Sequence, residues 1–96
     1  MSFAQIETFV TVAETGNMTR ASERLRIAQP ALSRQIRSLE EELGAPLFAR
    51  TPRGMRLLPD GVRFLEHARR ILAEIDAARG VVTRRGPGTR GRGDGG

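Results

Sequence analysis

The stretch from Gln29 to Leu43 constrains this chain most, because its apolar and polar residues separate at the period of an α-helix. The apolar residues recur at i, i+4, i+7 and i+11 and would form one buried stripe: Leu32, Ile36, Leu39 and Leu43. The opposite side carries Pro30, Ser33, Arg34 and Arg37. A helix that offers Gln, Ser and Arg from its first two turns is suited to a groove of DNA. The alternative is an ordinary surface helix with a solvated charged face.

Two helices are predicted ahead of this one. Asn17 is a suitable N-cap for the second, and the connection Arg26–Ala28 is as short as a helix-turn-helix requires. The inward stripe of this second helix consists of Met18, Ala21 and Leu25. The first helix, residues 3–13, has an apolar side and stops at Gly16, so it should be a hydrophobic buttress whose aromatic residues belong to the core. Glutamates 40–42 would be repelled by phosphates, so the 29–43 helix should enter DNA with its N-terminus first.

A short hairpin is predicted after the 29–43 helix. Leu47–Arg50 and Met55–Leu58 are brief strand-like runs joined by Thr51–Gly54, where Pro52 and Gly54 suit a type I turn. Three cations lie on or beside the hairpin: Arg50, Arg53 and Arg56. A helix-turn-helix followed by a basic hairpin is a winged helix, whose wing reaches a minor groove or the phosphates. The alternative is a solvated turn whose arginines keep the protein soluble.

Three blocks of the chain carry a resemblance to a known family. Residues 19–25 read TRASERL, residues 29–50 read QPALSRQIRSLEEELGAPLFAR, and residues 61–72 read GVRFLEHARRIL. These blocks closely resemble the N-terminal domain of LysR-type transcriptional regulators, and the similarity runs from Phe3 to Arg79 without a gap. The resemblance implies sequence-specific binding of double-stranded DNA for transcriptional regulation.

The same resemblance implies which side chains meet DNA. Base edges would be contacted by Gln29, Pro30, Ser33 and Arg34. Arg is suited to guanine O6 and N7, and Gln to adenine N6 and N7, which agrees with this assignment. The DNA backbone and the wing contacts would be served by Thr19, Arg20, Arg37, Arg50, Arg53 and Arg56.

Two positions depart from the usual pattern of the family. Ala28 stands where a Ser or Thr normally caps the recognition helix, which should cost about 1 kcal/mol and remove one phosphate contact. Leu58 stands at the next helix start, where the family often has Thr. Pro59 and Asp60 compensate in part, through a preset φ and a favourable interaction with the helix dipole. Both departures should weaken affinity or stability without changing the class of protein.

One long helix is predicted over residues 59–79, with Arg79 and Gly80 as its C-terminal cap. Its apolar stripe is broader than one packing surface needs. The resemblance implies a linker helix that pairs two copies, through Leu65, Ala68, Ile71, Leu72 and Ile75. A purely intramolecular role is the alternative. His67 is expected to be a polar surface residue.

The predicted fold class is mainly α. A winged helix-turn-helix of three helices and a short β-hairpin would occupy residues 1–58, the linker and dimerisation helix residues 59–79, and a disordered Gly/Arg-rich tail residues 80–96. In LysR-type regulators such a hinge leads into a large ligand-sensing domain. The chain would then be either an isolated DNA-binding fragment or a naturally short protein.

Composition narrows the function further. The chain has no cysteine and one histidine, so disulfides and thiolate metal sites are excluded, and we expect no cofactor, no small-molecule ligand and no enzymatic activity. Residues 1–79 hold 12 Arg and 10 acids (+2), and residues 80–96 hold 4 Arg and 1 Asp (+3), so the net +5 suits a polyanion. No basic leader or apolar run of about 18 residues occurs, so we expect a cytoplasmic protein without a membrane partner.

The expected partners are therefore an interrupted palindrome of double-stranded DNA and a second copy of the chain, as a homodimer or higher oligomer. A second function remains open at this point. The chain could instead be a truncated dimerisation partner that pairs through residues 59–79 with a full-length relative and modulates it.

Overall fold

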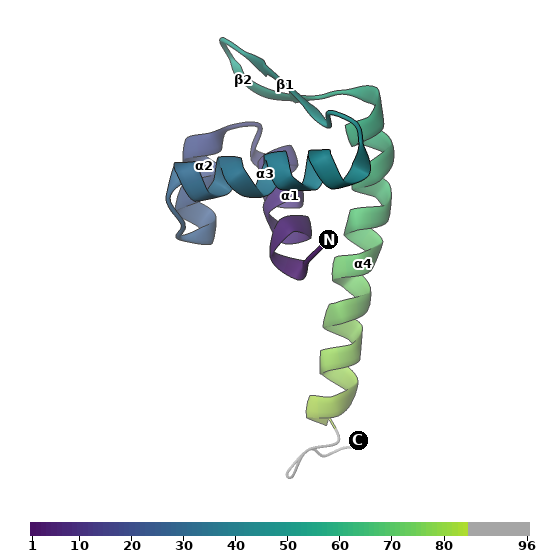
Figure 1. Cartoon of the computed structure of the whole chain (residues 1–96). Coiled ribbons are helices and arrows are strands. Elements are labelled where there is room, and N and C mark those ends of the chain that lie inside the picture. The colour runs from purple at the N-terminus through teal and green to yellow at the C-terminus, as the bar shows by residue number, and fades with distance from the viewer. Residues whose placement is uncertain (85–96) are drawn as a thin grey trace.

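The computed structural model describes residues 1–84, which form a small helical head with a hairpin and one long projecting helix (Figure 1). The elements in chain order are α1 (Phe3–Thr15), α2 (Met18–Leu25), α3 (Gln29–Leu43), β1 (Phe48–Thr51), β2 (Gly54–Leu57) and α4 (Pro59–Arg84). The predicted winged helix-turn-helix followed by a long helix is thus confirmed. None of the described helices is both long enough and apolar enough to cross a membrane.

Helix α1 is the centre of the head and packs against α2, α3 and α4. Its Phe9 is fully buried, and the Phe9 ring lies 5.3 Å from the ring of Phe48 in β1 and 5.0 Å from that of Phe64 in α4, measured between centroids. Each such pair contributes about 0.5–1.5 kcal/mol beyond the area that it buries. This aromatic cluster packs α1, β1 and α4 against one another. Phe3, expected in the core, is 39% exposed instead, and its ring lies under the guanidinium of Arg79.

The ends of the first helices follow local chemistry. The Asn17 side chain accepts a hydrogen bond from the backbone N–H of Arg20, which confirms the predicted N-cap of α2. Gly16 ends α1 in the left-handed region, at φ 65°, as does Gly44 after α3. Ala28 caps α3 without a side-chain hydrogen bond, as its methyl group requires.

The wing is a two-stranded antiparallel hairpin that is anchored to the head. Its register pairs Phe48 with Leu57 and Thr51 with Gly54, so each strand lies one residue away from the predicted span. The Met55 N–H donates to the carbonyl of Gly16 at 3.0 Å. Gly54 has φ 130°, and a Cβ there would lie only 2.3 Å from the same carbonyl oxygen. The close approach of the wing to the α1–α2 turn therefore requires glycine at this position.

Helix α4 starts at Pro59 as predicted but ends later than predicted. It continues to Arg84, so the expected cap at Gly80 is wrong and the expected tail begins with helical residues. A glycine inside a helix costs only about 1 kcal/mol relative to alanine. The residues that follow Gly80 remain helical, and the Thr83 hydroxyl donates to the Arg79 carbonyl at 2.8 Å. The rest of the expected tail, residues 85–96, lies outside the described residues.

Only part of the predicted dimerisation set is free on the surface of α4. Ala68 is 0% exposed and belongs to the core of the head, so it is not available to a second copy. Leu65 and Leu72 are half-buried and pack against the same core. Ile71 is 37% exposed, and Ile75 is half-buried without packing against the core. The breadth of the stripe arises because the head itself covers one side of α4.

Candidate nucleic-acid interface

Helix α3 buries one face in the head and leaves the other free. Leu32, Ile36 and Leu39 are buried, as the periodicity predicts. The last residue of the predicted stripe, Leu43, is 37% exposed instead, because the chain turns away at Gly44 before another element covers it. The outer face presents Gln29, Pro30, Arg34 and Arg37, all exposed, together with the half-buried Ser33.

Gln29 is held against α2 at the start of the recognition helix. Its side-chain amide nitrogen donates a hydrogen bond to the Thr19 hydroxyl at 3.0 Å. The bond joins a predicted base-contacting residue to a predicted backbone-contacting residue from the preceding helix. The carboxamide oxygen of Gln29 and a second amide N–H remain for other partners.

Ser33 is linked to the wing in the same way. The Arg50 Nη2 group donates to the Ser33 hydroxyl at 3.2 Å, which draws this β1 arginine towards α3 and away from the wing tip. Arg50 and Thr19 also line one shallow hollow of about 230 Å³ between the start of α2 and the hairpin. A guanidinium has five N–H donors, so most of those of Arg50 remain available for an anion.

The wing tip presents Arg53 to solvent. Thr51 closes the turn: its hydroxyl donates to the Gly54 carbonyl at 2.9 Å and accepts from the Arg53 backbone N–H at 3.2 Å. The turn is thus fixed by its own residues, while the Arg53 side chain stays exposed. Arg56, opposite Ala49 in the register, is exposed as well.

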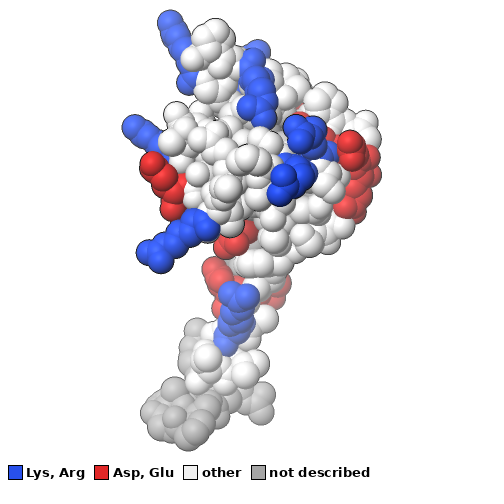
Figure 2. Space-filling view, turned by 60° about the vertical axis from the view of Figure 1, so that its left-hand side comes forward, with Lys and Arg blue, Asp and Glu red and all other residues white. Residues whose placement is uncertain are grey.

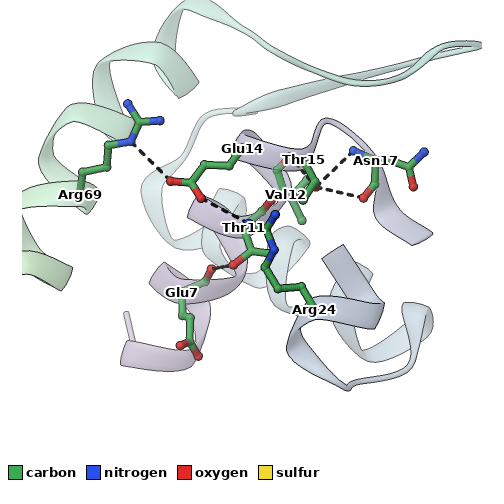
Figure 3. Close-up of polar contacts among 8 residues, drawn as sticks. All are labelled: Glu7, Thr11, Val12, Glu14, Thr15, Asn17, Arg24 and Arg69. Atoms are coloured by element: carbon green, nitrogen blue, oxygen red, sulfur yellow. Dashed lines mark hydrogen bonds and ion pairs between the residues drawn. The ribbon is translucent and has the colours of Figure 1, made fainter. Parts of the chain in front are cut away.

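The arginines that pair with carboxylates are not among those predicted to meet DNA. Glu14 on α1 pairs with Arg24 of α2 at 3.5 Å and with Arg69 of α4 at 3.8 Å, and Figure 3 shows these two arginines approaching it from different helices. Arg63 pairs with Asp60, and Arg70 with Glu66, both within α4.

Among the residues that the structure describes, no carboxylate pairs with the arginines predicted to meet DNA: Arg20, Arg34, Arg37, Arg50, Arg53 and Arg56. All six side chains are exposed. In Figure 2, cationic side chains project from several points of the head, separated by uncharged surface, with acidic groups towards its edges. The free cations therefore come from α2, α3 and both strands of the wing, which is suited to a polyanion that contacts all of these elements.

Two of the three glutamates at the end of α3 have structural partners. The Glu40 carboxylate accepts hydrogen bonds from the backbone N–H groups of Leu47 at 2.7 Å and Phe48 at 3.2 Å. Glu42 accepts from the N-terminal ammonium of Met1 at 2.6 Å. From the sequence alone these glutamates are recognisable only as negative charges. The structural role of Glu40 is not predicted, because its partners lie beyond the turn at Gly44. Within residues 1–84 no cluster of three or more His, Cys, Asp or Glu could hold a metal ion.

Comparison with known proteins places this geometry in a family. The family model of bacterial regulatory helix-turn-helix proteins, lysR family, matches residues 3–62. The chain belongs to the LysR family. This LysR-family chain is 48% identical over 88 residues to the transcriptional regulator ClcR of Pseudomonas putida, covering 90% of the chain and 30% of ClcR. It is 49% identical to BudR of Klebsiella aerogenes over 78 residues, 81% of the chain and 54% of BudR.

Solved structures of the family have the same fold. The DNA-binding domain of CbnR in complex with DNA has a TM-score of 0.78 and 45% identity, over 88% of this chain and 95% of that one. The DNA-binding domain of BenM in complex with catB site 1 DNA has a TM-score of 0.86 and 38% identity, over 93% of this chain and 100% of that one. The chain spans about a third of the length of ClcR and nearly the whole of these isolated domains.

Proposed function

We propose that this chain binds double-stranded DNA sequence-specifically in transcriptional regulation, with the N-terminal half of α3 in the major groove. One observation carries the proposal: the outer face of α3 and the elements beside it present exposed arginines that pair with no described carboxylate. Base edges are contacted by Gln29, Pro30, Ser33 and Arg34. The DNA complexes of the related CbnR and BenM domains support this role.

The flanking elements hold the DNA backbone. Thr19 and Arg20 from α2 and Arg37 from α3 contact phosphates on either side of the groove. Arg50 and Arg56 contact the backbone from the wing, while Arg53 at its tip lies in or beside the adjacent minor groove. The hydrogen bonds Gln29–Thr19 and Arg50–Ser33 support a surface in which base-contacting and backbone-contacting groups are neighbours.

Two copies of the chain pair through α4, as a homodimer or a higher oligomer. The head, residues 1–58, covers one side of α4, and other apolar residues of this helix are exposed: Val62, Ile71, Val81 and Val82. Two heads then present two α3 helices to the half-sites of an interrupted palindrome. A bacterial regulator of this kind works in the cytoplasm, where the DNA is, and this part of the chain needs no metal, cofactor or small molecule to bind it.

The alternative function, a truncated partner that modulates a full-length relative through α4, is not favoured. Such a partner needs the apolar surface of α4 but not a set of unpaired arginines on α2, α3 and the wing. Comparing the DNA affinity of the pure chain with that of mixed dimers separates the two functions.

Selection from a pool of random duplexes tests the proposal directly. The full chain should enrich an interrupted palindrome, and the logarithm of its affinity should fall linearly with the logarithm of salt concentration. Five arginines on phosphates or in the minor groove of each head predict a slope of about −4.5 per head. Equal retention of all sequences, or a slope near zero, would contradict the proposed function.

A further inference from the structure

The backbone of Leu47 is a junction between three elements of the proposed interface. Its N–H donates to the carboxylate of Glu40 on α3 at 2.7 Å, and the same oxygen accepts from Phe48 N–H, the start of β1, at 3.2 Å. Its carbonyl accepts from the N–H of Leu58, the residue before α4, at 2.9 Å. The Glu40 carboxylate and the backbone of one buried residue, Leu47, thus connect the recognition helix to both the wing and the long helix.

The junction is closely packed on both sides. Leu47 is 2% exposed, and a Cβ added to Gly61 in the first turn of α4 would lie 2.2 Å from the Leu47 carbonyl oxygen. On the other side, the Glu40 backbone carbonyl accepts from the N–H groups of Gly44 at 2.9 Å and Ala45 at 3.2 Å. Glu40 therefore holds the α3–β1 connection at both ends, once through its backbone and once through its side chain.

We infer that Glu40 is a positioning residue that fixes the orientation of α4 and the wing relative to α3, and thereby sets the half-site spacing that a dimer accepts. The inference rests on the proposed function. In a dimer paired through α4, the separation of the two α3 helices depends on how each α3 is held on its own α4. Adding one base pair between half-sites moves them apart by about 3.4 Å and rotates them by about 35°. A rigid junction resists that change, and a loosened one absorbs it.

The chemistry of the carboxylate supports a rigid junction. Hydrogen bonds from backbone N–H groups to an ionised acceptor are shorter and about twice as strong as neutral ones. Replacing Glu40 with alanine leaves the N–H groups of Leu47 and Phe48 without this acceptor, while the buried side chains of both residues stay in the core. The α3–β1 connection then becomes more flexible, although Leu47 and Phe48 remain buried. The head should therefore stay folded, while its orientation relative to α4 becomes less restricted.

The experiment compares the unchanged chain with Glu40→Ala, Glu40→Gln and the matched control Glu41→Ala. Glu41 is the exposed neighbour of Glu40, and its side chain has no partner among the described residues. Affinity is measured for the selected palindrome, for the same site with one base pair added or removed between half-sites, and for a single half-site. Loss of amide exchange protection at Leu47 reports whether the hydrogen bond is broken in each variant.

For the wild-type chain and Glu41→Ala, one inserted base pair should reduce affinity about tenfold, because the DNA must deform to restore the fit. For Glu40→Ala the reduction should fall to about threefold or less, with half-site affinity within about twofold of wild type. Glu40→Gln should restore the sharp spacing preference, since its amide oxygen can accept from the same two N–H groups.

A spacing penalty in Glu40→Ala equal to that of the wild type, with the Leu47 amide exposed to exchange, would overturn the inference and leave Glu40 a merely stabilising residue. If Glu40→Ala does not fold, Glu40→Asp is measured instead. Its side chain is one methylene shorter, so we expect the same reduced loss of affinity when one base pair is inserted between the half-sites. A wild-type chain without any palindrome preference would instead overturn the proposed function, so the two failures are distinguishable.

Discussion

Helices α3 and α4 are both amphipathic, but only α3 buries most of its apolar face within the chain. In α3 the residues Leu32, Ile36 and Leu39 are buried in the head, and the exposed side of its first half is mainly polar and cationic. At its end, the acidic Glu41 and Glu42 and the apolar Leu43 are exposed. In α4 the head covers one side, whereas apolar side chains elsewhere on the helix are exposed, Val62 by 57% and Val82 by 72%. Figure 1 shows the same contrast, with α3 lying across the head and α4 extending beyond it.

The comparison shows that helical period alone does not determine a partner. A helix whose apolar side chains are largely buried within the chain presents mainly hydrogen-bonding side chains to solvent, and these suit a groove of DNA. An incompletely covered apolar face suits another apolar helix. The following predictions test this division of roles between α3 and α4.

The largest effect is expected from the apolar face of α3. Leu32→Ala removes a fully buried side chain and should lower the free energy of unfolding by about 2–5 kcal/mol. Val82→Ala on the exposed part of α4 should change it by less than about 0.5 kcal/mol. Urea denaturation at low protein concentration measures both. Similar losses in the two variants would show that the projecting part of α4 is covered within the single chain.

The next largest effect concerns the free face of α4. Ile71→Glu with Ile75→Glu introduces charges where a second copy should pack, and unpaired charges in an interface cost several kcal/mol. The variant should lose at least about thirtyfold in affinity for the full palindrome while keeping half-site binding. Sedimentation should find it monomeric.

The matched control places the same two charges on the other side of α4, as Ala73→Glu with Ala77→Glu, both exposed residues. This control should behave like the wild type. Undiminished cooperativity on the full site in the Ile71 and Ile75 variant would exclude this face of α4 as the dimer interface.

A smaller effect is expected at the wing. Arg53→Ala should weaken sites with A·T-rich flanks about fivefold more than sites with G·C-rich flanks, because a narrow A·T-rich minor groove has a more negative potential. Competition binding with the two flanks gives the ratio directly. Arg63→Ala, which removes an exposed arginine paired with Asp60 on α4, is the control and should leave the ratio unchanged. An unchanged ratio in Arg53→Ala itself would remove the wing from sequence recognition.

The smallest effect concerns the start of α3. Ala28 has the extended backbone of an N-cap, φ −68° and ψ 146°, but offers no oxygen. Ala28→Ser should stabilise the chain by about 1 kcal/mol by accepting from a free N–H of the first turn. For a domain of this size that raises the Tm by about 4–8 °C. Ala28→Val, which adds bulk without an acceptor, should give no gain; equal melting temperatures for the two variants would contradict the capping argument.

The sequence predicted the elements whose determinants are local. The span of α3, the cap at Asn17, the stop at Gly16 and the start of α4 at Pro59 all depend on residues within one or two helical turns, and the structure confirms them. The two-residue displacement between the predicted and observed ends of α1 reflects the same local freedom, because helix ends are weakly specified.

The features that the sequence does not predict depend on contacts between residues that are far apart in the sequence. A stripe on α4 does not reveal which element covers it, so the prediction that Ala68 contacts a second copy is wrong, because the head buries it. The role of Glu40 follows only once the turn at Gly44 brings Leu47 back to its carboxylate. Gly80 has a residue type typical of a cap, yet the helix continues to Arg84 through the β-branched Val81, Val82 and Thr83, which are weak helix formers, so local propensity does not explain the later end. The contacts of individual side chains with DNA stay predictions.

The central claim is that α3 recognises base edges through Arg34, and one comparison tests it most directly. Arg34→Ala and Arg37→Ala, two exposed arginines of the same helix, are measured by fluorescence anisotropy on the selected site and on random DNA at one salt concentration. Arg34→Ala should cost about 1–3 kcal/mol on the selected site and little on random DNA, whereas Arg37→Ala should weaken both equally. Equal losses on both DNAs for Arg34→Ala would assign it to phosphate contact and contradict the claim.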